Sequence, residues 1–459
     1  MPARPIRIDP AEALRNGLEA IREGAGVPTS FPPEVLAEAD AAAGAARAEA
    51  PRVELAFVTI DPPGSRDLDQ AVHIERRGGG HRVSYAIADV AAFVAPGSGL
   101  DAEAHARAVT VYAPDERAPL HPPALSEGAA SLLPGQWRPA VLWTLDLDEH
   151  GELEEAAVAR ATVRSAAQHT YADLPSELEP LLREVGERRA AIERERGGVQ
   201  LAVPEQEVVR VGEGWTVEYR APLPSEEHNA QVSLLTGMAA ARLMLDAGTG
   251  ILRTQPPPDE RSLNRLRRQA LALGVEWPAA RPYPEFVRGL DPGRPAHAAL
   301  LHEATGVGRG AGYTAFDGEV PAEHSHFSIA ADYAHATAPL RRLQDRFVSE
   351  CCLAASAGEP VPAWVREGLA ALPEAMAAGA KRAGEVERGV VDLVEALLLE
   401  GREGERFDAV VIDEGLLALR EPAVRARIDE ASCPEPGSEI TVRLERADPA
   451  ARRVDFSPV

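Results

Sequence analysis

The hydrophobic period of this 459-residue chain changes three times, and that order of helix-like and strand-like segments constrains the fold more than any other feature. In order, we expect two helices over residues 9–23 and 32–48, strands over 53–60, 71–75 and 83–90, a hairpin turning at 148–151, mostly helix from about residue 177, and short strands after residue 405. Since 459 residues exceed what one compact core usually holds, this order predicts an α+β protein of several domains.

We expect three domains: a helical N-terminal module over residues 1–50, an α+β domain over 51–400 and a β domain over 401–459. The two N-terminal helices fit a helix-turn-helix, but the same pattern describes any helical hairpin. In the last domain five short runs alternate like strands, which predicts a small barrel of the OB type. A five-strand domain without nucleic-acid contact stays open, since OB surfaces stack bases on aromatics and this segment has only Phe407 and Phe456.

Composition excludes several classes of protein. A formal net charge of −24 argues against generic coating of nucleic acid, although Arg253, Arg261, Arg265, Arg267, Arg268, Arg341, Arg342 and Arg346 form positive islands. No apolar run is long enough to span a bilayer and the N-terminus lacks the apolar core of a secretion signal, so we expect a cytoplasmic protein without a membrane partner. No feature points to an obligate protein partner. The three cysteines form no C-x-x-C pair, and we expect Cys351 and Cys352 to be buried as small apolar residues.

Three carboxylates gather in the segment Thr-Ile-Asp-Pro-Pro-Gly-Ser-Arg-Asp-Leu-Asp-Gln, residues 59–70, where an apolar strand runs into a turn. Asp61, Asp67 and Asp69 could simply cap turns. However, Asp67 and Asp69 are two residues apart, so in extended backbone they point to one side, and converging carboxylates repel one another without a cation between them. Oxygen ligands suit magnesium, so the segment predicts a metal site of the kind that cleaves phosphodiesters.

Further motifs follow in order: Tyr85-Ala-Ile-Ala-Asp89, Val109-Thr-Val-Tyr112-Ala-Pro114, Ser131-Leu-Leu-Pro134 with Arg138-Pro139, Glu226-Glu227-His228-Asn229, and Tyr333-Ala-His335-Ala-Thr-Ala-Pro339-Leu-Arg341-Arg342 followed by Asp345. Together with the aspartates they make residues 53–395 resemble the catalytic (RNB) domain of the ribonuclease II family. The C-terminal segment is similar to the OB-fold RNA-binding domain that ends those enzymes. The region before residue 53 departs from the family, being too short for its paired cold-shock barrels.

The resemblance implies a hydrolytic 3′→5′ exoribonuclease that degrades single-stranded RNA, releases nucleoside 5′-monophosphates and serves RNA turnover. It implies magnesium, with manganese as a substitute. Asp61, Asp67 and Asp69 match metal-site aspartates, with Asp69 the position expected to be indispensable. Gln70 stands where the family usually has a fourth Asp; its carbonyl oxygen could still ligate magnesium, but it brings no charge.

The resemblance also assigns substrate contacts. Arg341 and Arg342 match an arginine pair beside the scissile phosphate, where a guanidinium can donate two hydrogen bonds. Tyr112 matches the aromatic on which terminal bases stack, and Leu201 falls where the opposite wall is often Phe. The remaining substrate contacts are Glu226 and its neighbour Glu227, expected at the 2′-hydroxyl of the terminal ribose, and His335, which falls in a motif where the family also carries His.

Two other functions stay open. A non-catalytic RNA-binding protein with a degenerate metal site would keep Tyr112 and the arginines, and Gln70 is the one sequence feature that favours it. A metal phosphoesterase acting on small nucleotides would need the aspartates but have no use for the terminal barrel. A zinc site at His324-Ser-His326 is disfavoured because no third ligand stands at suitable spacing.

Overall fold

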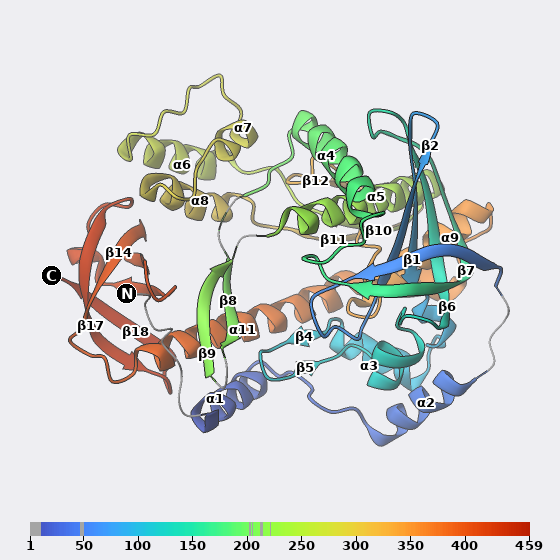
Figure 1. The fold of residues 1–459 in the computed structure, drawn as a ribbon, viewed down its shortest axis with the longest axis horizontal. Coiled ribbons are helices and arrows are strands. Elements are labelled where there is room, and N and C mark those ends of the chain that lie inside the picture. The colour runs from blue at the N-terminus through green and yellow to red at the C-terminus, as the bar shows by residue number, and fades with distance from the viewer. Residues whose placement is uncertain (1–10, 46–49, 202, 204, 212–213, 221) are drawn as a thin grey trace.

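A computed structural model describes residues 11–45, 50–201, 203, 205–211, 214–220 and 222–459. It contains two separate β-barrels, and helices pack on each of them (Figure 1). The fold is mixed α+β, as the sequence predicts. Within the described ranges, no helix combines the length and the apolar character that a membrane crossing requires.

The first barrel holds the predicted strands of the central domain. It contains β1 (Arg52–Ile60), β2 (Gln70–Arg77), β3 (Gly80–Ala88), β6 (Trp137–Leu147) and β7 (Leu153–His169). Neighbours along the chain pair antiparallel, and a parallel pairing of β1 with β7 closes the barrel. The predicted hairpin at 148–151 is confirmed as the β6–β7 turn, where Gly151 adopts a φ of +89° that favours glycine.

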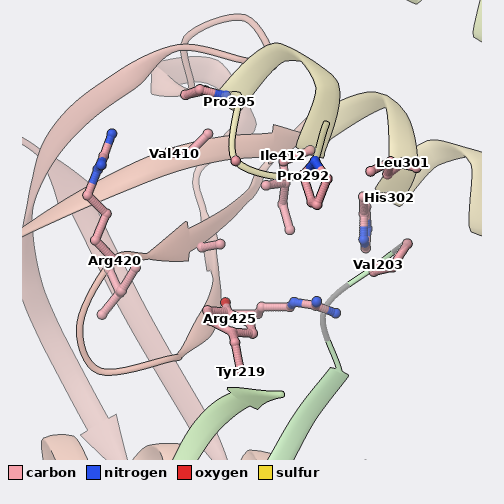
Figure 2. A pocket seen from close by; sticks show the side chains of 14 residues that line it. Val203, Tyr219, Pro292, Pro295, Leu301, His302, Val410, Ile412, Arg420 and Arg425 are labelled. Carbon is pink, nitrogen blue, oxygen red and sulfur yellow. The ribbon is translucent and has the colours of Figure 1, made fainter. Parts of the chain in front are cut away.

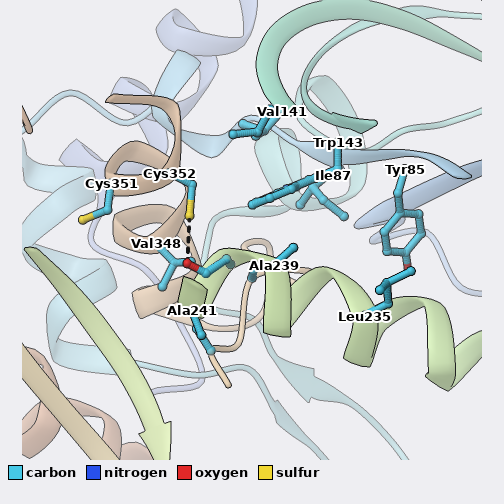
Figure 3. Packing of buried hydrophobic residues seen from close by; sticks show 14 of the residues in the cluster. Tyr85, Ile87, Val141, Trp143, Leu235, Ala239, Ala241, Val348, Cys351 and Cys352 are labelled. Carbon is cyan, nitrogen blue, oxygen red and sulfur yellow. Dashed lines mark hydrogen bonds between the residues drawn. The ribbon is translucent and has the colours of Figure 1, made fainter. Parts of the chain in front are cut away.

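One outer face of this barrel is covered by two helices, α5 (Pro224–Ala247) and α9 (Leu343–Ala357). Tyr85, Ile87, Val141 and Trp143 face Leu235, Ala239 and Ala241 of α5 and Val348 of α9 in one apolar cluster (Figure 3). Cys351 and Cys352 belong to the same cluster and are fully buried, which confirms their predicted role. The small residues on α5 let the helix lie close to the strands.

Further helices and strands lie between residues 99 and 369 in the chain, outside the first barrel and its two covering helices. They are α3 (Gly99–Arg107), β4 (Val111–Tyr112), β5 (Arg117–Ala118), α4 (Glu179–Arg196), β8 (Glu205–Val211), β9 (Gly214–Arg220), β10 (Thr249–Thr254), α6 (Glu260–Ala272), α7 (Tyr283–Arg288), α8 (Pro295–Val307), β11 (Gly312–Asp317), β12 (Ser325–His326), β13 (Ala331–Asp332) and α10 (Ala363–Leu369), with short helical turns at 90–92, 125–129 and 430–432. The hairpin β8–β9 and the pair β10–β11 fall in the stretch that the sequence predicts as mostly helical.

The second barrel confirms the C-terminal five-stranded barrel that the sequence predicts. It contains β14 (Arg406–Asp413), β15 (Leu416–Leu419), β16 (Arg425–Ile428), β17 (Glu439–Asp448) and β18 (Arg453–Pro458) in the closed order β14-β15-β16-β18-β17. The parallel pair of β16 with β18 gives the strand order of an OB barrel. Phe407 and Phe456 are buried and meet edge to face with centroids 5.8 Å apart, so both belong to the barrel's core and not to a base-stacking surface.

A 28-residue helix, α11 (Leu372–Leu399), connects the two halves. Its last turns pack into the second barrel, while α1 (Ala11–Gly24) lies along it, with Gly17 against Leu393. By contrast α2 (Pro33–Gly44) packs with α3 in a different apolar cluster. The two N-terminal helices therefore bury their apolar sides in separate cores, which differs from the compact pair of a helix-turn-helix.

A buried acid on α11 gives a test of this junction. Glu395 accepts hydrogen bonds from the Arg425 backbone N–H and from Gln206 Nε2, both at 2.7 Å, and burial raises its pKa to about 8. An unfolded glutamate titrates near 4.5, so the folded chain holds a proton that the unfolded chain loses. The free energy of unfolding should therefore fall as the pH rises from about 4.5 to about 8.

The substitution Glu395→Gln keeps both acceptor bonds and cannot ionise, so this part of the pH dependence should disappear and the variant should gain stability at pH 8. Urea unfolding at several pH values measures the effect. Glu387→Gln, at an exposed site on the same helix, should retain the wild-type slope. Equal slopes for wild type and Glu395→Gln would contradict the assignment.

Candidate active site

Two distant segments meet at one end of the first barrel: the loop 61–69 that follows β1, and residues 337–342 that precede α9. The loop turns at Pro62-Pro63-Gly64, where Gly64 has a φ of +84° and the Ser65 N–H donates to the Pro62 carbonyl. Two hydrogen bonds of 2.7 Å join the segments. The Leu340 backbone N–H donates to Asp69 Oδ1, and Gln70 Nε2 donates to the Thr337 carbonyl.

These bonds bring a buried carboxylate next to an arginine. Asp69 is only 3% exposed, and its Oδ2 lies 3.6 Å from Nε of Arg341. Burial raises the pKa of Asp69 to about 7 although Arg341 opposes the shift, and burial likewise raises the pKa of Asp61 to about 6. The Arg341 side chain remains about half exposed, so it can reach a ligand from this position.

Asp67 belongs to a network that the sequence does not reveal. Its Oδ1 accepts from Arg117 Nη1 at 2.6 Å and its Oδ2 accepts from the Tyr112 hydroxyl at 3.1 Å, while Arg117 also pairs with Glu127 at 2.6 Å. The Tyr112 ring is 50% exposed, so it is not a core tyrosine. A half-exposed aromatic side chain thus stands beside the carboxylates, and base stacking needs an accessible ring of this kind.

The three aspartates were expected to converge on a cation. Among the described residues, no group of three or more His, Cys, Asp or Glu side chains is arranged to hold a metal ion. Here Asp67 instead binds Arg117. Even so, Asp61 Oδ2 and Asp69 Oδ2 are buried without a hydrogen-bond partner, and such hard oxygens are the ligands that magnesium prefers. The donor set therefore fits magnesium.

Gln70 is held on both sides of its amide. Its Oε1 accepts a hydrogen bond from the Tyr85 hydroxyl, which also contacts Ser233 of α5, and its Nε2 donates to Thr337. A carboxylate could not donate to that carbonyl. In this structure Gln70 cross-links the barrel to the segment that carries Arg341; its expected ligand role stays a prediction.

The second arginine is differently engaged. Arg342 forms a two-pronged pair with Asp345, whose other contact is the Ala338 N–H at 2.7 Å, so Arg342 and Asp345 brace the turn before α9. Close to Arg342, His335 Nδ1 bonds the Tyr313 hydroxyl at 2.8 Å, and burial lowers the His335 pKa well below its usual range. Arg253 lies 4.7 Å above the Tyr313 ring.

The other residues expected to contact the substrate differ in their exposure and in their partners. Glu226 occupies the first turn of α5, pairs with Arg220, and lies near Tyr171, whose pKa is raised by burial and by the charge of Asp61. Glu227 beside it is exposed. Leu201 packs against the apolar cluster of α6, α7 and α8, so its expected place opposite Tyr112 stays a prediction.

The arginines of the positive islands lie in different surroundings. Arg346 is buried, bonding Asp101 at 2.7 Å and the Val94 carbonyl at 2.8 Å, so its expected place in a positive island is wrong. On α6, Arg265 pairs with Glu303 and Arg267 lies over Trp277. The two histidines of the H-x-H motif also have different partners. His324 forms a hydrogen bond with Asp332, whereas His326 meets the Tyr333 ring edge to face.

Comparison with known proteins identifies the family to which the chain belongs. A family model described as the RNB domain matches residues 52–355. The chain belongs to the RNB family of ribonucleases II and R. A second model, the RNase II-type exonuclease C-terminal S1 domain, matches residues 405–459, the second barrel. The family resemblance expected from the motifs is thereby confirmed.

Among relatives, ribonuclease R of Aquifex aeolicus is 30% identical over 422 residues, which are 84% of this chain and 58% of that protein. Ribonuclease R of Escherichia coli is 29% identical over 318 residues, 64% of this chain and 38% of that protein. This RNB chain thus spans between about two fifths and three fifths of the length of these two relatives.

Solved structures share the fold of this RNB protein. RNase R of Mycoplasma genitalium in complex with ribose methylated single-stranded RNA aligns with a TM-score of 0.86 at 18% identity, over 98% of this chain and 78% of the other. Yeast Ssd1, a pseudonuclease, aligns with a TM-score of 0.68 at 14% identity, over 94% and 58%. The fold therefore occurs both with and without nuclease activity.

The cross-link through Gln70 can be tested directly. Gln70→Ala removes the donor to Thr337 and the acceptor for Tyr85, leaving partly buried polar groups unpaired, so we expect a loss of about 1–3 kcal/mol in the free energy of unfolding. Urea denaturation measures it. Gln136→Ala, which removes an exposed side chain bonded to Arg138, should change stability by less than about 0.5 kcal/mol. Similar small effects for both variants would contradict the cross-link.

Proposed function

We propose that this chain is a magnesium-dependent 3′→5′ exoribonuclease that hydrolyses single-stranded RNA and releases nucleoside 5′-monophosphates. The observation that carries the proposal is the meeting of Arg341 with the buried, unpartnered oxygens of Asp61 and Asp69, beside the exposed ring of Tyr112. The complex of the Mycoplasma genitalium relative with single-stranded RNA supports the choice of substrate.

The aspartates and Arg341 would have different roles in the reaction. Asp61, Asp67 and Asp69 would hold magnesium, which when bound stabilises charge on the attacking and leaving oxygens of a phosphodiester. Asp67 would do so with the acceptor sites that Arg117 and Tyr112, its present partners, leave free. Arg341 would donate hydrogen bonds to the non-bridging phosphate oxygens.

Substrate recognition would come from groups around that centre. Tyr112 would stack the terminal base, a contact that tolerates every base. Glu226, near Tyr171 and Asp61, would accept a hydrogen bond from the ribose 2′-hydroxyl and so select RNA over DNA. The substrate site would be completed by Glu227, Leu201, Arg342 and His335. Arg342 would contribute mainly by fixing the turn that presents Arg341.

A non-catalytic RNA-binding protein is the second candidate. It is favoured by Gln70, which brings no charge to the site, and by the likeness to a pseudonuclease. The third possibility, a phosphoesterase for small nucleotides, gives no role to the S1 barrel. Digestion of long RNA separates the first candidate from both others.

The decisive assay uses 5′-labelled single-stranded RNA and matched DNA, with magnesium or with chelator, resolved on a denaturing gel. We expect progressive shortening of RNA only, lost with chelator and reduced by at least about a hundredfold in Asp69→Asn, since the substitution removes a charge from the site. Asp246→Asn, at an exposed position of α5, should digest like wild type. RNA that is bound but stays intact would establish the binding protein instead.

Tyr112 makes two separable contacts, which two substitutions distinguish. Tyr112→Phe keeps the ring and loses the hydroxyl bond to Asp67, so RNA affinity should change little. Tyr112→Ala removes the stacking surface and should weaken binding of an RNA oligonucleotide by about 1–3 kcal/mol. Fluorescence anisotropy on the Asp69→Asn background measures both; equal affinities for Phe and Ala would exclude stacking at this position.

A further inference from the structure

Two donors from one small hairpin hold the carboxylate of Asp67. β4 and β5 pair with Tyr112 directly opposite Arg117, and cross-strand neighbours of this kind have Cβ atoms about 5 Å apart. The Tyr112 hydroxyl donates to Asp67 Oδ2 at 3.1 Å, and Arg117 Nη1 donates to Asp67 Oδ1 at 2.6 Å. Each oxygen of a carboxylate expected to hold magnesium therefore has a partner on this hairpin.

Arg117 is also held through its second terminal nitrogen. Its Nη2 pairs with Glu127 Oε1 at 2.6 Å, and Glu127 lies in the helical turn at 125–129. The side chains of Asp67, Glu127 and Arg117 are only 12%, 23% and 26% exposed. Charges at this depth are screened less by salt than charges at the surface. A guanidinium that bridges two carboxylates is thus fixed in position, and its charge belongs to the site.

Other arginines that are shielded from solvent have partners outside the proposed reaction. Arg346 binds Asp101 at 2.7 Å. Arg425 lines the cavity between the S1 barrel, α8 and the hairpin β8–β9 (Figure 2), where its guanidinium lies 5.8 Å from the ring centroid of Tyr219. Arg117 differs from both, because its partner is one of the three aspartates proposed to hold magnesium.

The charge of Arg117 bears directly on a cation bound at Asp67. A magnesium ion that uses the free acceptor sites of Asp67 would lie close to the guanidinium, because both contact the same carboxylate. Between a divalent ion and a unit charge about 5 Å apart, even the dielectric of water leaves a repulsion that changes affinity about tenfold. Gln70 brings no charge that would offset it.

We propose that Arg117 is a positioning residue that holds Asp67 in place for the metal and, by its charge, lowers the affinity of the site for that metal. The inference rests on the proposed function, which assigns Asp67 to magnesium. It gives the hairpin β4–β5 a second role beside base stacking: the strand opposite Tyr112 sets how strongly the aspartates bind a cation.

Titration with Mn²⁺, followed by the electron paramagnetic resonance signal of the free ion, measures metal binding without RNA and without turnover. The difference between each protein and its Asp69→Asn counterpart separates ions bound at the site from ions on the acidic surface. Arg117→Gln should bind Mn²⁺ at the site at least about tenfold more tightly than wild type, since it removes the repelling charge. Arg117→Lys keeps that charge and should stay within about threefold of wild type.

Arg66→Gln is the matched control. Arg66 precedes Asp67 in the chain, lies 3.6 Å from Glu127 and has a side chain that is 64% exposed. The substitution therefore removes the same formal charge from the same loop, but from a position that water and salt screen. Mn²⁺ affinity should change by less than about twofold.

A purely structural role of Arg117 predicts the opposite sign, because a displaced Asp67 would bind metal more weakly. Thermal midpoints verify that each variant folds. If Arg117→Gln does not fold, the double variant with Glu127→Gln removes both charges of the pair and should show the same gain. Unchanged or weaker Mn²⁺ binding in the folded variant overturns the proposal, as does an equal gain in Arg117→Lys.

Failure of the proposed function is a distinct result. If wild type leaves RNA intact in the gel assay, the exonuclease fails, while the Mn²⁺ titrations still decide the role of Arg117. If wild type digests RNA and Arg117→Gln binds Mn²⁺ no more tightly, only the role of Arg117 fails. If neither protein differs from its Asp69→Asn counterpart, the metal site fails and this proposal fails with it.

Discussion

The hydrogen bond from the Leu340 N–H to Asp69 is the contact on which the candidate site depends. It joins residues 271 positions apart and fixes a carboxylate in a place where water cannot solvate it. A buried charge is tolerated only when other groups compensate for lost hydration, and here a backbone donor and the nearby Arg341 do so. Gln70 bonds the same segment at Thr337, so the loop and the turn before α9 hold each other in place.

The elements behind this contact explain how such a position is maintained. β1 and β2 leave the loop at the end of a closed barrel, and α9 begins directly after the arginine turn. Because α9 packs on the same barrel through fully buried residues, a shift of the turn would disturb the close packing of the core. The site therefore draws its rigidity from the apolar cluster shown in Figure 3.

Much of this could be predicted from the sequence, because alternation of apolar residues is a local signal. It identified the strands of both barrels, and α5 lies in the stretch that was expected to be mostly helical. The hairpin β8–β9 was missed although Trp215, Val217 and Tyr219 alternate with polar residues along β9. It forms a two-stranded sheet that packs on α11, so its place in the fold depends on a distant partner. The helices α1 and α2 were found, but their separate packing depends on distant partners.

The same distinction applies to the site. The spacing of the aspartates and the family resemblance of the arginine pair indicate the main parts of the candidate site, whereas the partners of those residues come from remote positions. Arg117 lies 50 residues from Asp67, and Tyr85 meets Gln70 only because β2 and β3 are paired. Arg346 has the same charge as Arg341 in the sequence, yet one is buried in a structural ion pair and the other reaches the site. Charge type alone could not separate them.

The length of helix α11 sets the distance between the parts of the protein that it connects. With 28 residues at 1.5 Å each it is about 42 Å long. Its first residues, Leu372 and Met376, pack in the central core, and its last turns pack into the S1 barrel. It thus fixes the separation between the central core and the S1 barrel. A molecule shorter than this helix could not contact both of its ends, so if the chain acts as the proposed exoribonuclease, only longer RNA chains would contact both halves of the protein.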